Sequence, residues 1–99
     1  MFYSRIIAGP FVFTLSPRAR YRAVAGEGVV IQLDRDQIVV VNELGLELLE
    51  QLKAGATIAQ LATSVSANYE VTFSRASDDI AHFIAELQAQ ELVSQQAES

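Results

Sequence analysis

The apolar residues of this chain change their spacing at Asn42, and that change divides the chain into two halves. Before Asn42, short runs rich in β-branched residues alternate with turn residues, which predicts strands. After Asn42, apolar residues recur every three or four positions, which predicts helices. Both halves must share one core, because 99 residues are too few for two domains. The order of the halves predicts an α+β fold.

The first half contains three predicted sheet strands, at residues 20–24, 29–33 and 37–41. A polar turn at residues 34–36 makes the last two strands a hairpin. Residues 1–17 are punctuated by Gly9-Pro10 and Ser16-Pro17, with a short apolar run between them. We interpret residues 1–17 as an N-terminal arm or an extra strand.

Three helices are predicted in the second half. Asn42 caps the first helix, which Gly55 ends. Thr57 and Gln60 form a capping box for the second, and Ser74 can cap the third. Residues 94–99 form a polar tail. Helices in this order beside a hairpin predict a winged helix-turn-helix-like fold, with an N-terminal three-stranded antiparallel sheet followed by three helices.

The composition excludes several functional classes. The chain has no cysteine and one histidine, so zinc fingers, iron–sulfur sites and multi-histidine metal sites are excluded. A net charge of −5 and a predicted third helix with a single cation, Arg75, argue against a nucleic-acid partner. The apolar run at residues 6–15 is too short to cross a membrane. No catalytic or cofactor-binding motif is present, so we expect a non-enzymatic protein without a cofactor. The absence of cysteine fits a cytoplasmic protein.

The predicted strand at residues 37–41 is apolar on both faces, whereas a half-exposed strand normally alternates. One explanation is that the N-terminal arm covers the second face; the other is that the strand borders a groove filled by a partner. Its edge also carries no proline, lysine or inward charge to prevent strand pairing. An extended peptide could therefore add to this edge as a further strand.

Motifs along the chain resemble those of the PqqD family. They begin with residues 28–33 and with residues 40–45, where Val41 and Asn42 stand in an "LNxxG" segment. Residues 54–58 are similar to the family's "dGxTv" junction, and residues 69–71 to its "Y-x-V" turn. Residues 79–87 resemble its third helix, and Leu92-Val93 its "gLv" ending. The resemblance covers residues 18–93, which we therefore interpret as a PqqD-like peptide-recognition domain. Glu91 stands where the family usually has glycine, so the third helix is expected to end differently here.

The resemblance implies a function. The family recognises the leader segments of ribosomally made precursor peptides, as in pyrroloquinoline quinone and lasso-peptide biosynthesis. It presents them to a maturation enzyme such as a radical-SAM enzyme or a leader peptidase. In the family, the leader adds as a strand beside the third strand and packs on the third helix.

We expect a peptide-binding site on the third strand and one flank of the third helix. Sequence does not decide which flank faces the strand; we chose the flank with Phe83 and the carboxylates. The predicted peptide-binding residues are Gln37, Ile38, Val39, Val40, Val41, Ala76, Asp79, Phe83, Glu86 and Gln90. The alternatives are a scaffold module that forms a homodimer through the same edge and a degenerate winged-helix DNA-binding regulator.

Overall fold

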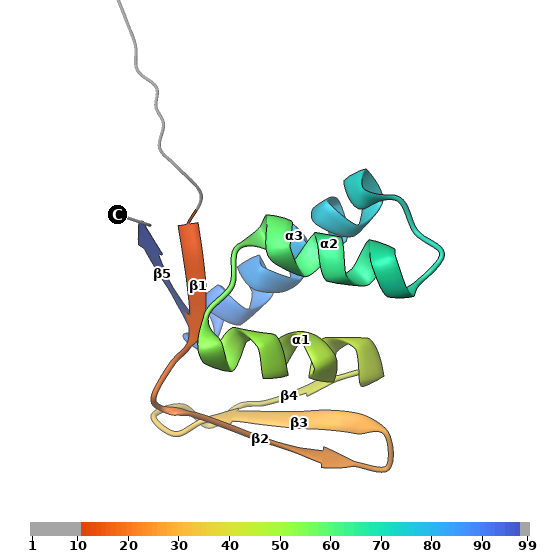
Figure 1. Cartoon of the computed structure of the whole chain (residues 1–99). Coiled ribbons are helices and arrows are strands. Elements are labelled where there is room, and N and C mark those ends of the chain that lie inside the picture. The colour runs from red at the N-terminus through yellow and green to blue at the C-terminus, as the bar shows by residue number, and fades with distance from the viewer. Residues whose placement is uncertain (1–10, 98–99) are drawn as a thin grey trace, which may run out of the picture.

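The computed structural model describes residues 11–97, which form an α+β fold with two small sheets and three helices (Figure 1). The order along the chain is β1 (Phe11–Leu15), β2 (Ala19–Val24), β3 (Glu27–Gln32), β4 (Ile38–Val41), α1 (Glu43–Ala54), α2 (Ile58–Asn68), α3 (Phe73–Ala89) and β5 (Val93–Ala97). Strands β2, β3 and β4 form an antiparallel sheet in that order, and β1 pairs with β5. The three-stranded sheet and the three helices that follow it confirm the predicted winged-helix-like class.

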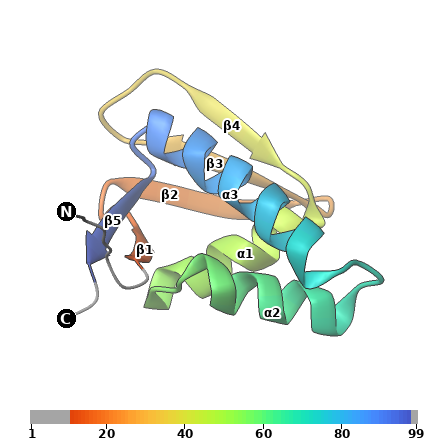
Figure 2. The same ribbon diagram turned by 90° about the horizontal axis from the view of Figure 1, so that it is seen from above.

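The core lies between the three-stranded sheet, the helices and β1. Its fully buried side chains come from almost every layer: Val30, Leu49, Leu52, Leu61, Ile84, Leu87 and Leu92. Helix α1 lies on one face of the sheet, and α3 runs alongside β4 (Figure 2). The sheet therefore keeps one face free of helices.

The helix starts follow local capping chemistry. The Asn42 side chain accepts a hydrogen bond from the Gly45 amide at 2.8 Å, as predicted. The predicted capping box at Thr57 and Gln60 is also present. The cap predicted for α3 is wrong by two residues, because Thr72 rather than Ser74 accepts the hydrogen bond from the Arg75 amide.

Strand β1 lies within the N-terminal arm or extra strand predicted at residues 1–17, of which residues 1–10 lie outside the described residues. Its partner β5 is the main feature that the sequence did not predict. Residues 93–97, which include most of the predicted polar tail, form β5 and pair antiparallel with β1. Phe13 anchors this sheet, because it is buried and its backbone exchanges two hydrogen bonds with Ala56. The sequence of β5 is polar, so it does not show the apolar pattern that predicts a strand. Its strand conformation depends on pairing with β1, about 80 residues earlier in the chain. The sheet strands also shift by one or two residues from prediction, and β4 begins at Ile38 rather than Gln37.

Helix α3 ends in a Schellman motif with Glu91 in the left-handed position. Glu91 has φ 59°, the Leu92 amide bonds the Leu87 carbonyl at 2.8 Å, and the Glu91 amide bonds the Gln88 carbonyl at 2.9 Å. The expectation that the missing glycine would change this helix end is therefore wrong. The conformation is kept, at the cost of placing a Cβ where glycine is preferred.

Replacing Glu91 with glycine should stabilise the domain by about 1 kcal/mol, because glycine adopts this conformation without strain. The substitution removes the Arg35–Glu91 ion pair at 3.0 Å, but this pair is exposed and contributes little. Glu91→Ala is the matched control, since it loses the ion pair and keeps the Cβ. Urea unfolding measures the free energy of unfolding of both variants. If Glu91→Gly were no more stable than Glu91→Ala, the left-handed conformation of Glu91 would not be strained.

Candidate peptide-binding site

The free edge of β4 presents the backbone groups of two residues. The β2–β3 hairpin turns through Ala25 and Gly26, both with positive φ, so Val24 and Glu27 form its closing hydrogen-bonded pair. In an antiparallel pair, successive residues of a strand direct their N–H and C=O groups alternately to the two neighbouring strands. Because Glu27 bonds to β2, Val30 directs its N–H and C=O groups toward β4, where its partner is Val39. It follows that Val39 points its backbone groups into the sheet, whereas Ile38 and Val40 point theirs outward.

A groove of about 450 Å³ runs between this edge and α3. Residues of β4 form one wall and residues of α3 the other. The two elements run in nearly parallel directions in the view of Figure 2. The lining is mainly apolar: Val39, Val40, Val41, Asn42, Leu44, Gly45, Leu48, Val65, Tyr69, Val71, Ala76, Asp79, Ile80, Phe83, Glu86 and Leu87. An open strand edge and an apolar wall thus lie on the same groove.

Seven of the ten predicted site residues line this groove: Val39, Val40, Val41, Ala76, Asp79, Phe83 and Glu86. The predicted flank of α3 is therefore the one that faces β4. Three residues do not line it. Gln37 precedes β4, and Ile38 directs its side chain to the helix-free face of the sheet. Gln90 is the C-cap of α3, where its side-chain Oε1 is buried without a hydrogen-bond partner.

Sequence reasoning missed the groove residues contributed by α1, α2 and the loop before α3. Tyr69 and Val71 belong to the turn at residues 69–71, which the sequence indicated only as a family motif, and Leu44 lies at the start of α1. Tyr69 is 41% exposed, and its hydroxyl donates a hydrogen bond to Glu47 at 2.9 Å. This bond raises the pKa of Tyr69. A large exposed aromatic residue after a helix was the available signal.

Among residues 11–97, the charged side chains on the groove wall are two carboxylates, Asp79 and Glu86. Asp79 is paired with Arg75 on the preceding turn of α3, with an N–O distance of 3.1 Å. Glu86 forms no ion pair with any of residues 11–97. Within the described part of the chain, no lysine or arginine lines the groove. The groove is therefore apolar with a negative rim.

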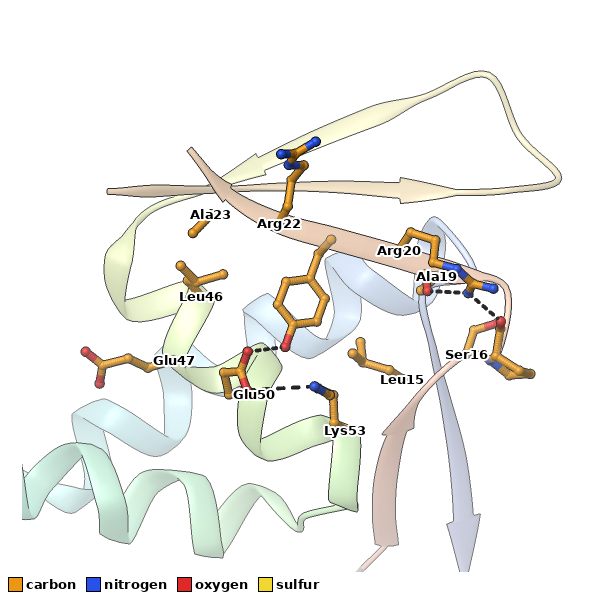
Figure 3. Close-up of a pocket in the computed structure, with 12 residues that line it drawn as sticks. Leu15, Ser16, Ala19, Arg20, Arg22, Ala23, Leu46, Glu47, Glu50 and Lys53 are labelled. Atoms are coloured by element: carbon orange, nitrogen blue, oxygen red, sulfur yellow. Dashed lines mark hydrogen bonds and ion pairs between the residues drawn. The ribbon is translucent and has the colours of Figure 1, made fainter. Parts of the chain in front are cut away.

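A second hollow, of about 720 Å³, lies between the other edge strand, β2, and α1. Its lining is much more charged and includes Arg20, Arg22, Glu47, Glu50 and Lys53 (Figure 3). The Tyr21 hydroxyl donates a hydrogen bond to Glu50, and Lys53 lies 4.0 Å from the same carboxylate. These internal contacts engage the polar groups of Tyr21, Glu50 and Lys53. The β4 groove is therefore the better place for an apolar peptide.

Alkaline pH should weaken the fold through Tyr21. Burial, followed by the hydrogen bond to Glu50, raises the pKa of Tyr21 to about 12. Because folding favours the protonated phenol, its stabilisation is complete below pH 10 and is lost as the pH rises toward 12. The stability difference between wild type and Tyr21→Phe should therefore narrow over this range in urea titrations. Tyr69 is present in both proteins, so its contribution cancels in the comparison. A stability difference that stays constant between pH 10 and pH 12 would contradict the raised pKa of Tyr21.

Residues 11–97 contain no cluster of three or more histidine, aspartate or glutamate side chains placed to hold a metal ion. Within the same range, none of the helices has the length and apolar character needed to cross a membrane.

The fold and the groove define a winged-helix-like α+β domain with an apolar groove beside an unpaired strand edge. The family model described as coenzyme PQQ synthesis protein D (PqqD) matches residues 27–93. The chain belongs to the PqqD family, as its motifs predicted. The matched region contains β3, β4 and all three helices, and therefore the whole groove.

A solved structure has a similar fold: TbiB1 in complex with the TbiA(beta) leader peptide. The superposition has a TM-score of 0.76 and covers 86% of this chain and 99% of that chain, at 19% sequence identity. At this identity the likeness shows the shared fold. A search of curated proteins found no match.

Proposed function

We propose that this protein is a non-catalytic chaperone that binds the leader segment of a ribosomally made precursor peptide. The observation that carries this proposal is the coincidence of the open β4 edge with the apolar groove against α3. Membership of the PqqD family supports it, as does the fold shared with TbiB1, a protein solved with a leader peptide.

The proposed mechanism is strand addition. The leader would extend the β2–β3–β4 sheet by hydrogen bonding to the outward backbone groups of Ile38 and Val40. These bonds supply affinity that is independent of sequence. Its side chains on the α3 side would enter the groove beside Phe83, where apolar burial favours binding. The unpaired carboxylate of Glu86 would disfavour an acidic residue nearby.

We further propose that the bound leader is delivered to a separate maturation enzyme, such as a radical-SAM enzyme or a leader peptidase. The described residues offer a binding groove and no cluster of acidic or histidine side chains placed to hold a metal ion, which suits a presenting role. Self-pairing through the β4 edge would compete with the peptide for the same backbone groups.

Two phenylalanines on α3 allow a controlled test of the proposed site. Phe83 lines the groove and packs on the core, whereas Phe73 is 48% exposed at the helix start and does not line it. Phe83→Ala should weaken binding by about 10- to 100-fold, the loss expected for one large buried apolar side chain. Phe73→Ala should leave binding unchanged. The measurement is fluorescence anisotropy with the labelled N-terminal half of any short precursor encoded beside this gene.

Thermal unfolding of both variants checks that Phe83→Ala remains folded at the assay temperature. Equal effects of the two substitutions would contradict the groove as the binding site. A folded wild-type protein that binds no such peptide, but whose mass increases with concentration, would instead favour a self-associating module.

A further inference from the structure

The helix-free face of the sheet carries two rows of side chains that stop at the open β4 edge. Strand register places Arg20, Ile31 and Ile38 in one row. It places Arg22, Val29 and Val40 in the next. Each row therefore begins with a cation on β2 and ends with an apolar residue on β4.

The two terminal residues of these rows are unusually exposed for aliphatic side chains. Ile38 is 67% exposed and Val40 is 58% exposed. Strand β1, which contains the phenylalanines expected to cover this face, instead pairs with β5 and directs Phe13 into the core. The first explanation for the two-sided apolar strand is therefore wrong for residues 11–15.

The same two residues also point their backbone N–H and C=O groups away from β3. A peptide strand bonded to them must place its own residues directly opposite, on the helix-free face. Its intervening residues would then face the groove. Strand addition thus continues both rows by one side chain each, next to Ile38 and Val40.

We propose that the bound segment is read on both faces. This inference rests on the proposed function and specifies the class of ligand. The ligand is an extended peptide segment with about four consecutive apolar residues, rather than apolar residues at alternate positions only. Every second residue of the bound peptide enters the groove beside Phe83. The residues between them lie on the helix-free face and cover Ile38 and Val40, which explains why β4 is apolar on both faces.

The test uses the full chain and a cell-displayed library of random dodecapeptides. Clones are kept when they bind wild type and lose binding to Phe83→Ala, so that every retained clone depends on the groove. Retained clones are then measured against Ile38→Thr, because Ile38 does not line the groove whereas Val40 does. Threonine preserves strand propensity and the backbone donors, but it replaces apolar surface with a hydroxyl.

The matched control is Val24→Thr, because Val24 is 49% exposed on the far strand of the same sheet. We expect retained clones to contain consecutive apolar residues and to lose about threefold in affinity against Ile38→Thr, with no loss against Val24→Thr. Clones with alternating apolar and polar residues that bind Ile38→Thr as tightly as wild type would overturn two-sided reading and leave the proposed function intact. A library without groove-dependent clones would overturn both.

Discussion

Val40→Pro should reduce leader-peptide affinity by about 5- to 150-fold without unfolding the domain. Proline removes the Val40 N–H, which the strand register directs to the open edge. The peptide carbonyl that it would bond is then buried without a partner, and leaving such a group unsatisfied costs about 1–3 kcal/mol. The fold tolerates the change because proline is accepted on an edge strand when its N–H side faces solvent. Anisotropy titration against the same labelled peptide measures the loss.

Two neighbouring substitutions serve as controls. Val40→Ala keeps the N–H and shortens the side chain, so it should retain much more affinity than Val40→Pro. Val39→Pro removes a hydrogen bond to Val30 within the sheet and should destabilise the fold itself. If Val40→Pro bound the peptide as well as Val40→Ala does, strand addition at this edge would be wrong.

Gly28→Ala should destabilise the domain by about 1–3 kcal/mol, the usual cost of overpacking. Gly28 lies on β3 directly opposite Val41. A Cβ added there would meet Val41 Cγ2 at 2.7 Å and Leu46 Cδ1 at 3.0 Å. Leu46 can rotate away, but Val41 is buried between β3 and the start of α1. Because Val41 also lines the groove, peptide affinity should fall with stability.

A double-mutant cycle identifies the cause of this loss. Val41→Ala alone should destabilise by leaving a cavity, but it removes the methyl group that the Gly28→Ala side chain would strike. The combined variant should therefore be more stable than the sum of the two single effects by about 0.5 kcal/mol or more. Additive free energies of unfolding, measured in urea, would show that the contact with Val41 is not the cause.

Local chemistry explains which parts of the fold were predictable. Asn42, Thr57 and Gln60 act within a few residues of themselves, so their sequence alone specified two helix starts. Strand β5 could not be found this way, because its residues are polar and its partner lies at the other end of the chain. Glu91 kept a left-handed helix end because the Schellman hydrogen bonds and the buried Leu92 outweigh its local preference.

The candidate site was predictable to the extent that helical periodicity and strand composition define it. The spacing of Asp79, Phe83 and Glu86 predicts that they share one flank of α3, and this flank faces β4. Neighbours from α1 and the Tyr69 turn were missed because their position depends on tertiary packing. The outward direction of the Ile38 and Val40 backbone groups requires the register of the whole sheet, which is set by the turn at Ala25 and Gly26.

Amide hydrogen exchange, followed residue by residue by NMR, tests strand addition most directly. In the free protein, the Val39 amide should exchange slowly, because it bonds within the sheet, while the Ile38 and Val40 amides should exchange rapidly. Saturation with the leader peptide should slow Ile38 and Val40 strongly and change Val39 little. Tight peptide binding that leaves Ile38 and Val40 exchanging as in the free protein would contradict the central claim.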